Sequence, residues 1–142
     1  MAKGEGLNAD MISRLIDRAI EGMSYAYTPY SGFRVGAALL TESGEIYTGC
    51  NIENAAYTPT NCAFFKAVSE GERHFAAICI VGGKDGKLAD YTSPCGVCRQ
   101  VMMEFCEPEQ FKIILAISRE EYRIYTLKEL LPEGFGPARL AR

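Results

Sequence analysis

Three cysteines carry the chemistry that this sequence could do. Cys95 and Cys98 form a Cys-x-x-Cys pair at the expected start of a helix, and Cys62 stands alone upstream of them. Three protein ligands with a fourth position open are typical of a catalytic zinc site, whereas four protein ligands close a structural one. The spacing therefore predicts one Zn²⁺ held by Cys62, Cys95 and Cys98.

The residue two places after Cys62 is Phe64, where a zinc hydrolase of this type needs a carboxylate. A positioned carboxylate moves protons in the transition state, and a phenyl ring cannot accept one. The sequence therefore predicts a metal site without its proton carrier. No catalytic acid or base is assigned.

Two other interpretations of the cysteines stay open. Cys95 and Cys98 also fit a thioredoxin-like redox pair. The chain has no tryptophan, and the only proline near the pair precedes it, so this interpretation is disfavoured. A closed structural zinc would need a fourth ligand, and the only histidine, His74, lies in a polar stretch. We expect His74 to face solvent.

Length and composition limit the other classes of function. At 142 residues the chain is expected to be a single domain spanning 1–142. The net charge of −3 argues against a nucleic-acid partner. No N-terminal apolar region or long apolar run predicts a membrane partner, so a cytoplasmic location is expected. In that compartment cysteines are reduced thiols or metal ligands, and we expect Cys50, Cys79 and Cys106 to pack in the core.

The elements that position these residues follow from apolar periodicity and turn residues. In chain order we predict a helix from Asn8 or Asp10 to Met23, strands at 33–39 and 46–51, a short helix at 62–69, a strand at 75–81, a polar loop at 82–93, a helix from Cys95 to before Pro108, strands at 111–117 and 122–125, and a helix through 131 capped by Thr126. This order predicts an α/β fold, a sheet covered by helices.

Several stretches of the chain match a known family in order. They are Pro29-Tyr30-Ser31-Gly32-Phe33-Arg34-Val35-Gly36-Ala37-Ala38-Leu39-Leu40, Gly49-Cys50-Asn51-Ile52-Glu53-Asn54-Ala55-Ala56-Tyr57, Asn61-Cys62-Ala63, Phe65-Lys66-Ala67-Val68-Ser69-Glu70-Gly71 and Pro94-Cys95-Gly96-Val97-Cys98-Arg99-Gln100-Val101. Over nearly its whole length the chain resembles the small cytidine deaminases.

The resemblance implies a three-layer α/β/α fold with a five-stranded mixed sheet, assembled as a homotetramer. It implies zinc-dependent hydrolysis of cytidine or deoxycytidine to the uridine nucleoside and ammonia, a step of pyrimidine salvage. The partner is then a small pyrimidine nucleoside. The zinc is expected between the N-terminal ends of two helices.

The resemblance also implies roles for individual residues. Phe33 would pack against the pyrimidine, and the Ala63 backbone would contact the base edge. Asn51 and Glu53 would hold the ribose hydroxyls, and Arg99 would offset the thiolate charge. A neighbouring subunit would supply Ala55, Tyr57 and Phe135. Without the flanking motif, the two phenylalanines would be core or interface residues. Asn51 and Glu53 would merely cap a strand end.

The chain departs from the family pattern after Cys62-Ala63. The family continues with Glu-Arg-Thr-Ala, whereas this chain passes directly to Phe64. Four residues turn a helix by about 400°, so their loss rotates the rest by only ~40° and the fold should survive. The lost glutamate is the group that shuttles protons in such deaminases, and Glu70 lies about two turns away. The alternative function is therefore an inactive zinc- and nucleoside-binding homologue.

Overall fold

The computed structural model describes residues 7–56 and 63–140. Its elements are α1 (Ala9–Met23), β1 (Phe33–Thr41), β2 (Ile46–Cys50), α2 (Ala63–Ser69), β3 (Phe75–Lys84), α3 (Gly96–Phe105), β4 (Lys112–Ala116), β5 (Tyr122–Thr126), α4 (Leu127–Leu130) and the 3-10 helix η2 (Pro137–Leu140). The strands form one five-stranded sheet in the order β2-β1-β3-β4-β5. Only β3 and β4 are parallel, which makes the sheet mixed.

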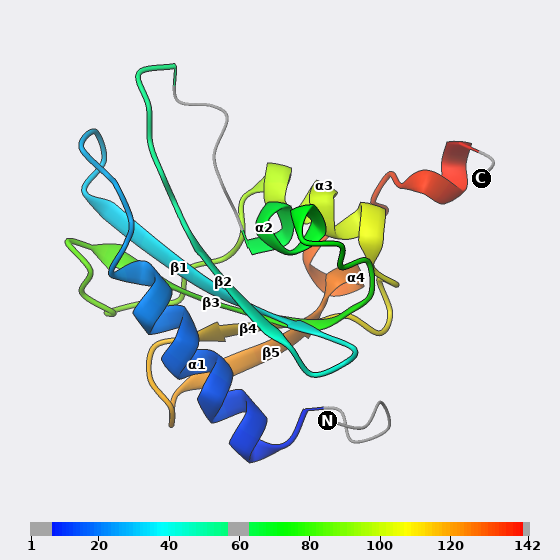
Figure 1. The fold of residues 1–142 in the computed structure, drawn as a ribbon, viewed down its shortest axis with the longest axis horizontal. Helices are drawn as coiled ribbons and strands as arrows, with labels where there is room; N and C mark the ends of the chain where they lie inside the picture. Colours follow the sequence, from blue (N-terminus) through cyan, green and yellow to red (C-terminus); the bar gives the residue numbers. More distant parts are fainter. Residues whose placement is uncertain (1–6, 57–62, 141–142) are drawn as a thin grey trace.

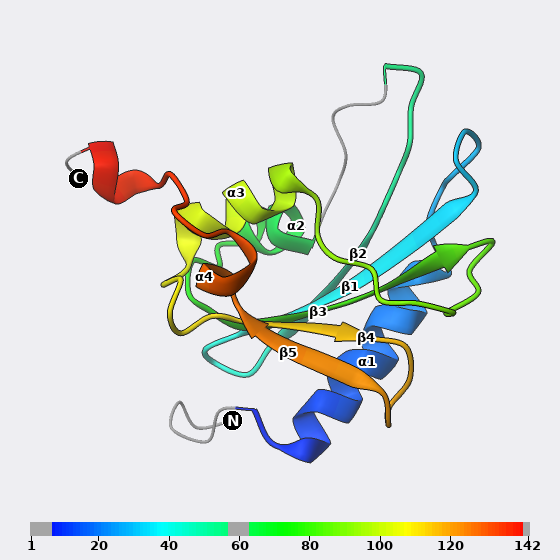
Figure 2. The ribbon, with the colours of Figure 1, turned by 180° about the vertical axis from the view of Figure 1, so that it is seen from behind.

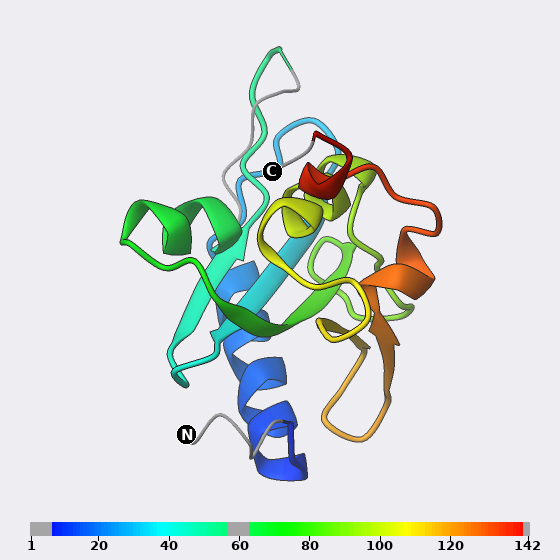
Figure 3. The same cartoon turned by 90° about the vertical axis from the view of Figure 1, so that its right-hand side faces the viewer.

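Helices cover both faces of this sheet. Helix α1 crosses one face, while α2, α3 and α4 lie on the other (Figures 1 and 2). In the side view of Figure 3, the sheet lies between α1 on one face and α2 and α3 on the other. The predicted α/β class and the three-layer, five-stranded arrangement are therefore confirmed. Among the described residues, no helix has the length and apolar character needed to cross a membrane.

Helix α1 forms where the sequence predicts it. The side-chain oxygen of Asn8 accepts a hydrogen bond from the Met11 N–H at 2.8 Å, which caps the helix. Helix and sheet approach closely at Gly36 of β1, where an added Cβ would lie 2.1 Å from the Ala19 carbonyl oxygen. Only a residue without a side chain fits there. Helix α1 therefore rests directly on the backbone of β1.

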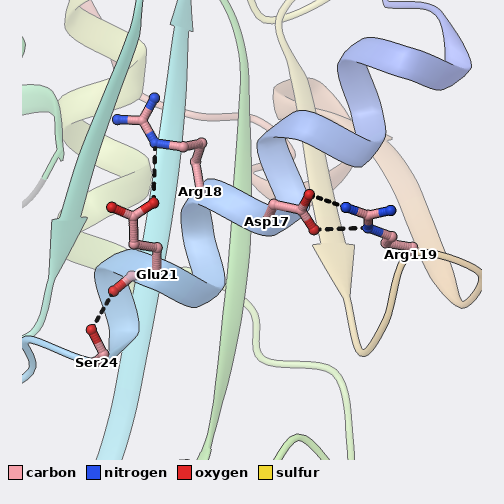
Figure 4. Close-up of polar contacts among 5 residues, drawn as sticks. All are labelled: Asp17, Arg18, Glu21, Ser24 and Arg119. Atoms are coloured by element: carbon pink, nitrogen blue, oxygen red, sulfur yellow. Dashed lines mark hydrogen bonds and ion pairs between the residues drawn. The ribbon is translucent and has the colours of Figure 1, made fainter.

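The exposed side of α1 carries charged contacts, drawn in Figure 4. The Arg119 guanidinium donates two hydrogen bonds to the Asp17 carboxylate, linking α1 to the β4–β5 turn. Arg18 lies 3.7 Å from the Glu21 carboxylate, and the Ser24 hydroxyl donates to the Glu21 carbonyl oxygen at 2.6 Å. All of these contacts lie on the face of the sheet opposite α2 and α3.

Strand β1 contributes side chains to both faces of the sheet, because successive side chains point to alternate faces. Ala38 and Leu40 pack against α1, whereas Leu39 packs with the apolar cluster under α2, α3 and α4. Phe33, Val35 and Ala37 share the side of Leu39 because side chains in a strand alternate. The predicted strand pattern thus sets which residues can reach a site on the α2–α3 side.

Strand β3 departs from its predicted end. We expected a polar loop from residue 82, but β3 continues through Lys84. A Cβ at Gly83 would lie 1.8 Å from the Lys87 carbonyl oxygen, and one at Gly82 would lie 2.9 Å from the Thr92 hydroxyl. These glycines therefore permit close packing of the following loop rather than a turn. The turn itself comes at Asp85 and Gly86, which have φ of 55° and 78°.

The prediction for the other cysteines and the histidine is confirmed in part. Burial raises the pKa of the Cys79 and Cys106 thiols to about 12. Cys79 is buried in the core, as predicted, whereas Cys106 is half-buried and packs against the core. His74 is exposed, as predicted. Cys50 is half-buried and lines a cavity instead of packing wholly in the core.

Candidate functional site

A cavity of about 350 Å³ lies between the sheet and the starts of α2 and α3. It brings together five residues that the sequence analysis selected: Phe33, Asn51, Ala63, Cys95 and Cys98. Its walls also include residues that the analysis did not select: Val35, Ala37, Cys50, Phe64, Thr92 and Met102. The predicted ligand Cys62 and the predicted contact Tyr57 lie outside the described residues. A volume above 300 Å³ and mostly apolar walls are usual for a small-molecule site.

The remaining predicted residues do not line this cavity. Glu53, Ala55, Arg99 and Phe135 lie outside it. A larger cavity of about 910 Å³ lies near the end of α3 and contains none of the predicted site residues. Chemistry, rather than size, therefore identifies the smaller cavity as the candidate site.

The cysteine pair occupies the start of α3. Cys95 has extended backbone angles and stands at the N-cap position, and its sulfur lies 3.5 Å from that of Cys98. Two thiolates on one tetrahedral zinc, each at about 2.3 Å, lie roughly 3.8 Å apart. The observed separation, without a bound ion, is already close to that value. The donor pair fits zinc.

The environment of Cys95 favours its thiolate form. Burial alone would raise the pKa of Cys95, but hydrogen bonds from the N–H groups of Cys98 and Val97, together with the contact to the Cys98 sulfur, outweigh it and lower the pKa. Amides at a helix start stabilise negative charge in this way. Within the described ranges no three His, Cys, Asp or Glu side chains lie close enough to hold a metal. The third predicted donor, Cys62, falls outside those ranges.

Arg99 fixes the segment that leads into the pair. Its guanidinium donates to the Pro94 carbonyl oxygen at 2.8 Å, to the Ser93 hydroxyl at 3.0 Å and to the Leu130 carbonyl oxygen at 2.6 Å. The first two bonds hold the chain immediately before Cys95. The third ties it to the end of α4. The structure thus gives Arg99 a positioning role, and its effect on the thiolate charge stays a prediction.

Asn51 is bound to the backbone of β1. Its side-chain oxygen accepts from the Val35 N–H at 2.9 Å, and its side-chain nitrogen donates to the Phe33 carbonyl oxygen at 2.7 Å. Phe33 lines the cavity and is 38% exposed. Asn51 therefore sets the position of Phe33, besides lining the cavity itself.

Glu53 binds the loop that precedes β1. Its carboxylate accepts hydrogen bonds from the N–H groups of Tyr30 and Ser31 at 3.0 and 3.1 Å and from the Ser31 hydroxyl. The Ser31 hydroxyl is the largest cause that holds the pKa of Glu53 below its usual range. The carboxylate is thus ionised and engaged, just outside the cavity.

The start of α2 is apolar where the family pattern is charged. Ala63 lines the cavity, and Phe64 is only 2% exposed. The Phe64 ring packs against Phe75 and Phe111, with centroid distances of 4.9 and 5.8 Å. The ring belongs to the aromatic core and forms part of the cavity wall. No carboxylate is present among the described residues that line the cavity.

The residues expected to act on a neighbouring copy are exposed. Phe135 is 57% exposed, and its carbonyl oxygen accepts a hydrogen bond from the Gln100 side chain at 2.8 Å. Ala55 is exposed in a segment that projects from the sheet (Figure 1). Neither residue reaches the cavity of its own chain, and no described contact tests their role in a neighbour's.

Comparison with known proteins gives concordant matches. Residues 10–114 match the family described as the cytidine and deoxycytidylate deaminase zinc-binding region. The chain is 46% identical to the cytidine deaminase of Sporosarcina psychrophila, with 87% of this chain and 90% of the relative covered. It resembles the crystal structure of cytidine deaminase from Burkholderia pseudomallei, with a TM-score of 0.76, 41% identity and coverage of 86% and 97%. The Mycobacterium tuberculosis cytidine deaminase structure matches with a TM-score of 0.74, 35% identity and coverage of 92% and 98%.

Proposed function

The chain belongs to the cytidine deaminase family, and we propose that it carries the family's zinc-dependent deamination of cytidine or deoxycytidine on a site that lacks the usual proton carrier. The products are uridine or deoxyuridine and ammonia. The observation that carries the proposal is one cavity that joins Phe33, Asn51 and Ala63 to the Cys95–Cys98 pair.

Cys95 and Cys98 hold the zinc together with Cys62. The short distance between the first two sulfurs and the amides at the start of α3 support this assignment. When bound, zinc lowers the pKa of water and thereby supplies hydroxide at neutral pH. Arg99 keeps Cys95 in place through the Pro94 carbonyl group.

The nucleoside lies in the cavity with its base against Phe33. Asn51 and Glu53 hold the ribose hydroxyls, and the backbone of Ala63 contacts the base edge. The position of Phe33, Asn51 and Ala63 on one cavity supports these roles. The apolar walls exclude water from the base, which strengthens the polar contacts that remain.

The proton carrier is the missing part. Two relatives match over 128 and 125 positions, yet the matches cover 87% and 85% of this chain, which is about 124 and 121 of its 142 residues. About four positions of each match therefore have no counterpart here, which supports a missing block of four residues. Because the described residues that line the cavity include no carboxylate, the protein turns over slowly, and the limiting case is a homologue that binds zinc and nucleoside without catalysis.

The assembly and the location of the protein are proposed from the same family membership. A homotetramer would use Ala55, Tyr57 and Phe135 in a neighbour's site, and the exposure of Ala55 and Phe135 supports this. The protein would act as a single domain in the cytoplasm, in pyrimidine salvage. Light scattering that gives a monomer of 15.6 kDa would refute the assembly.

Insertion of Glu-Arg-Thr-Ala between Ala63 and Phe64 tests the central point. The insertion lengthens α2 by about one turn, or ~6 Å, toward the cavity, while Phe64 keeps its place in the aromatic core. Deamination, followed by ultraviolet absorbance, should rise by about 10²–10⁴-fold or more. The matched control inserts Gln-Arg-Thr-Ala, which has the same shape without the acid and should stay near the starting rate. An ordinary enzymatic rate for the unchanged chain, with its mass verified, would contradict the proposal.

A further inference from the structure

The hydroxyl of Ser31 connects two residues of the proposed nucleoside site. It donates a hydrogen bond to the Glu53 carboxylate and accepts one from the Phe33 N–H at 3.0 Å. We propose that Ser31 is a positioning residue for nucleoside binding, which transmits the position of the Glu53 carboxylate to the Phe33 ring. This inference rests on the proposed function, because the ring and the carboxylate are its expected substrate contacts.

The backbone of Phe33 is held on both sides. Its N–H bonds to Ser31, and its carbonyl oxygen accepts from the Asn51 side chain at 2.7 Å. The next bond along β1 is that from the Val35 N–H to Asn51 at 2.9 Å. Phe33 also pairs with Lys84 in the β1–β3 ladder, and it is 38% exposed beside the cavity. The direction of the ring is therefore set by this pairing together with the bonds from Ser31 and Asn51, of which the Ser31 bond is the one on the loop side.

The loop around Ser31 is in turn fixed by the end of β3. Lys84 donates from its ammonium group to the Ser31 carbonyl oxygen at 2.6 Å, and the Asp85 N–H donates to the Gly32 carbonyl oxygen at 2.7 Å. Gly32 has φ of +67°, which only glycine adopts without strain. The Ser31 hydroxyl is thus presented at a fixed point rather than on a freely moving loop.

Loss of the hydroxyl would act on both partners at once. The Phe33 N–H would lose its acceptor, and the Glu53 carboxylate would lose one of three donors. The carboxylate would keep the Tyr30 and Ser31 amides, so the loop should remain folded. The expected consequence is a Phe33 ring with a wider range of directions and weaker packing on the base.

The experiment measures uridine binding by calorimetry, because uridine is the product and is not consumed. Ser31→Ala should weaken binding about tenfold, the usual size for a hydrogen bond to a charged group. Ser31→Thr keeps a hydroxyl and should retain most of the affinity. The matched control is Ser24→Ala, an exposed serine just after the end of α1 whose hydroxyl bonds only to the Glu21 carbonyl oxygen among the described contacts (Figure 4).

A double-mutant cycle separates positioning from a general loss of structure. In a Phe33→Ala background there is no ring to position, so Ser31→Ala should change the affinity much less than it does alone. Equal effects of Ser31→Ala with and without the ring would overturn the proposal, and so would unchanged binding by Ser31→Ala. If the unchanged chain does not bind uridine, the proposed function and this inference both fail. If the unchanged chain binds uridine but either of the two results above is found, only this inference fails.

Discussion

Two helices begin at the same cavity, and they are built in different ways. Helix α3 has ten residues, and its first turn directs N–H groups at the Cys95 sulfur, while Arg99 holds the chain before it. Helix α2 has seven residues, no acidic residue in its first turn, and an anchor that is apolar, the Phe64 ring. Helix α3 presents two thiols that fit zinc at its start, whereas the described start of α2 presents a buried apolar ring.

The difference separates two requirements of the proposed site, metal binding and proton transfer. The metal donors proposed at α3 are two thiols held by backbone geometry, and the third proposed donor, Cys62, precedes α2. Proton transfer depends on one carboxylate at a defined place, which no packing interaction replaces. We therefore expect the fold and the metal donors of the proposed site to persist without the proton carrier.

Removal of one thiol should have the largest effect. Cys98→Ser should leave the purified protein with almost no zinc, because even residues that only orient a ligand change affinity by about 10–100-fold. Zinc per chain is measured by elemental analysis. Cys106→Ser is the control, since this half-buried thiol has a pKa of about 12 and lies outside the cavity. Full zinc content in Cys98→Ser would remove α3 from the metal site.

Loss of the Phe64 ring that anchors α2 should have the next largest effect. Phe64→Ala should lower the free energy of unfolding by about 3–5 kcal/mol, because it removes a ring buried among Phe75, Phe105 and Phe111. Urea denaturation measures the change. Val97→Ala on α3 removes a side chain that is 65% exposed and should change the free energy by less than about 0.5 kcal/mol. A small effect at Phe64 would mean that α2 is held in some other way.

A smaller effect is expected at the support of the cysteine pair. Arg99→Met removes three hydrogen bonds and should weaken zinc binding about 10–100-fold by competition with a chelator. Arg99→Lys should restore little, because an ammonium group cannot make the same planar set of bonds. An unchanged affinity in Arg99→Met would show that α3 holds its thiols without this support.

The smallest effect should come from the ion pair on the far face. The Arg119 hydrogen bond lowers the pKa of Asp17 in the folded chain, so its stabilisation is present above the ordinary aspartate pKa and is lost as pH falls through the lowered value. Asp17→Asn should slightly lower the thermal midpoint at about pH 7, and the difference should shrink as pH falls through the lowered Asp17 pKa. Zinc content and uridine binding should not change. A change in either would mean that α1 influences the cavity through this contact.

Much of the fold could be predicted because its signals are local. The Asn8 cap, the alternation of β1 and the Thr126 cap with Glu129 each depend on residues a few positions apart. The 3-10 helix η2 was not predicted, because a single turn leaves no periodic pattern. Gly82 and Gly83 were predicted to lie in a polar loop, whereas β3 continues through both. A glycine needed for close approach and a glycine needed for a turn cannot be told apart without the partner segment.

The candidate site was predicted in part for the same reason. The alternation that places Phe33 on one side of β1 also places Val35 and Ala37 there, and this signal could have identified both as cavity walls. Cys50 and Met102 could not be found in this way, because their place in the cavity depends on how β2 and α3 meet the sheet. The bonds of Glu53 to the 30–31 loop also depend on segments far apart in sequence.

Gly36 gives β1 a mechanical role as well as a geometric one. On one side of this strand the backbone bears directly on α1, and on the other its neighbours Val35 and Ala37 form the wall of the cavity. Because no side chain lies between strand and helix at Gly36, no flexible side chain can accommodate a displacement of the strand toward the helix. The cavity wall formed by Val35 and Ala37 is therefore as rigid as helix α1 behind it. A substitution on the α1 side of β1 would change how a nucleoside fits without contacting the nucleoside.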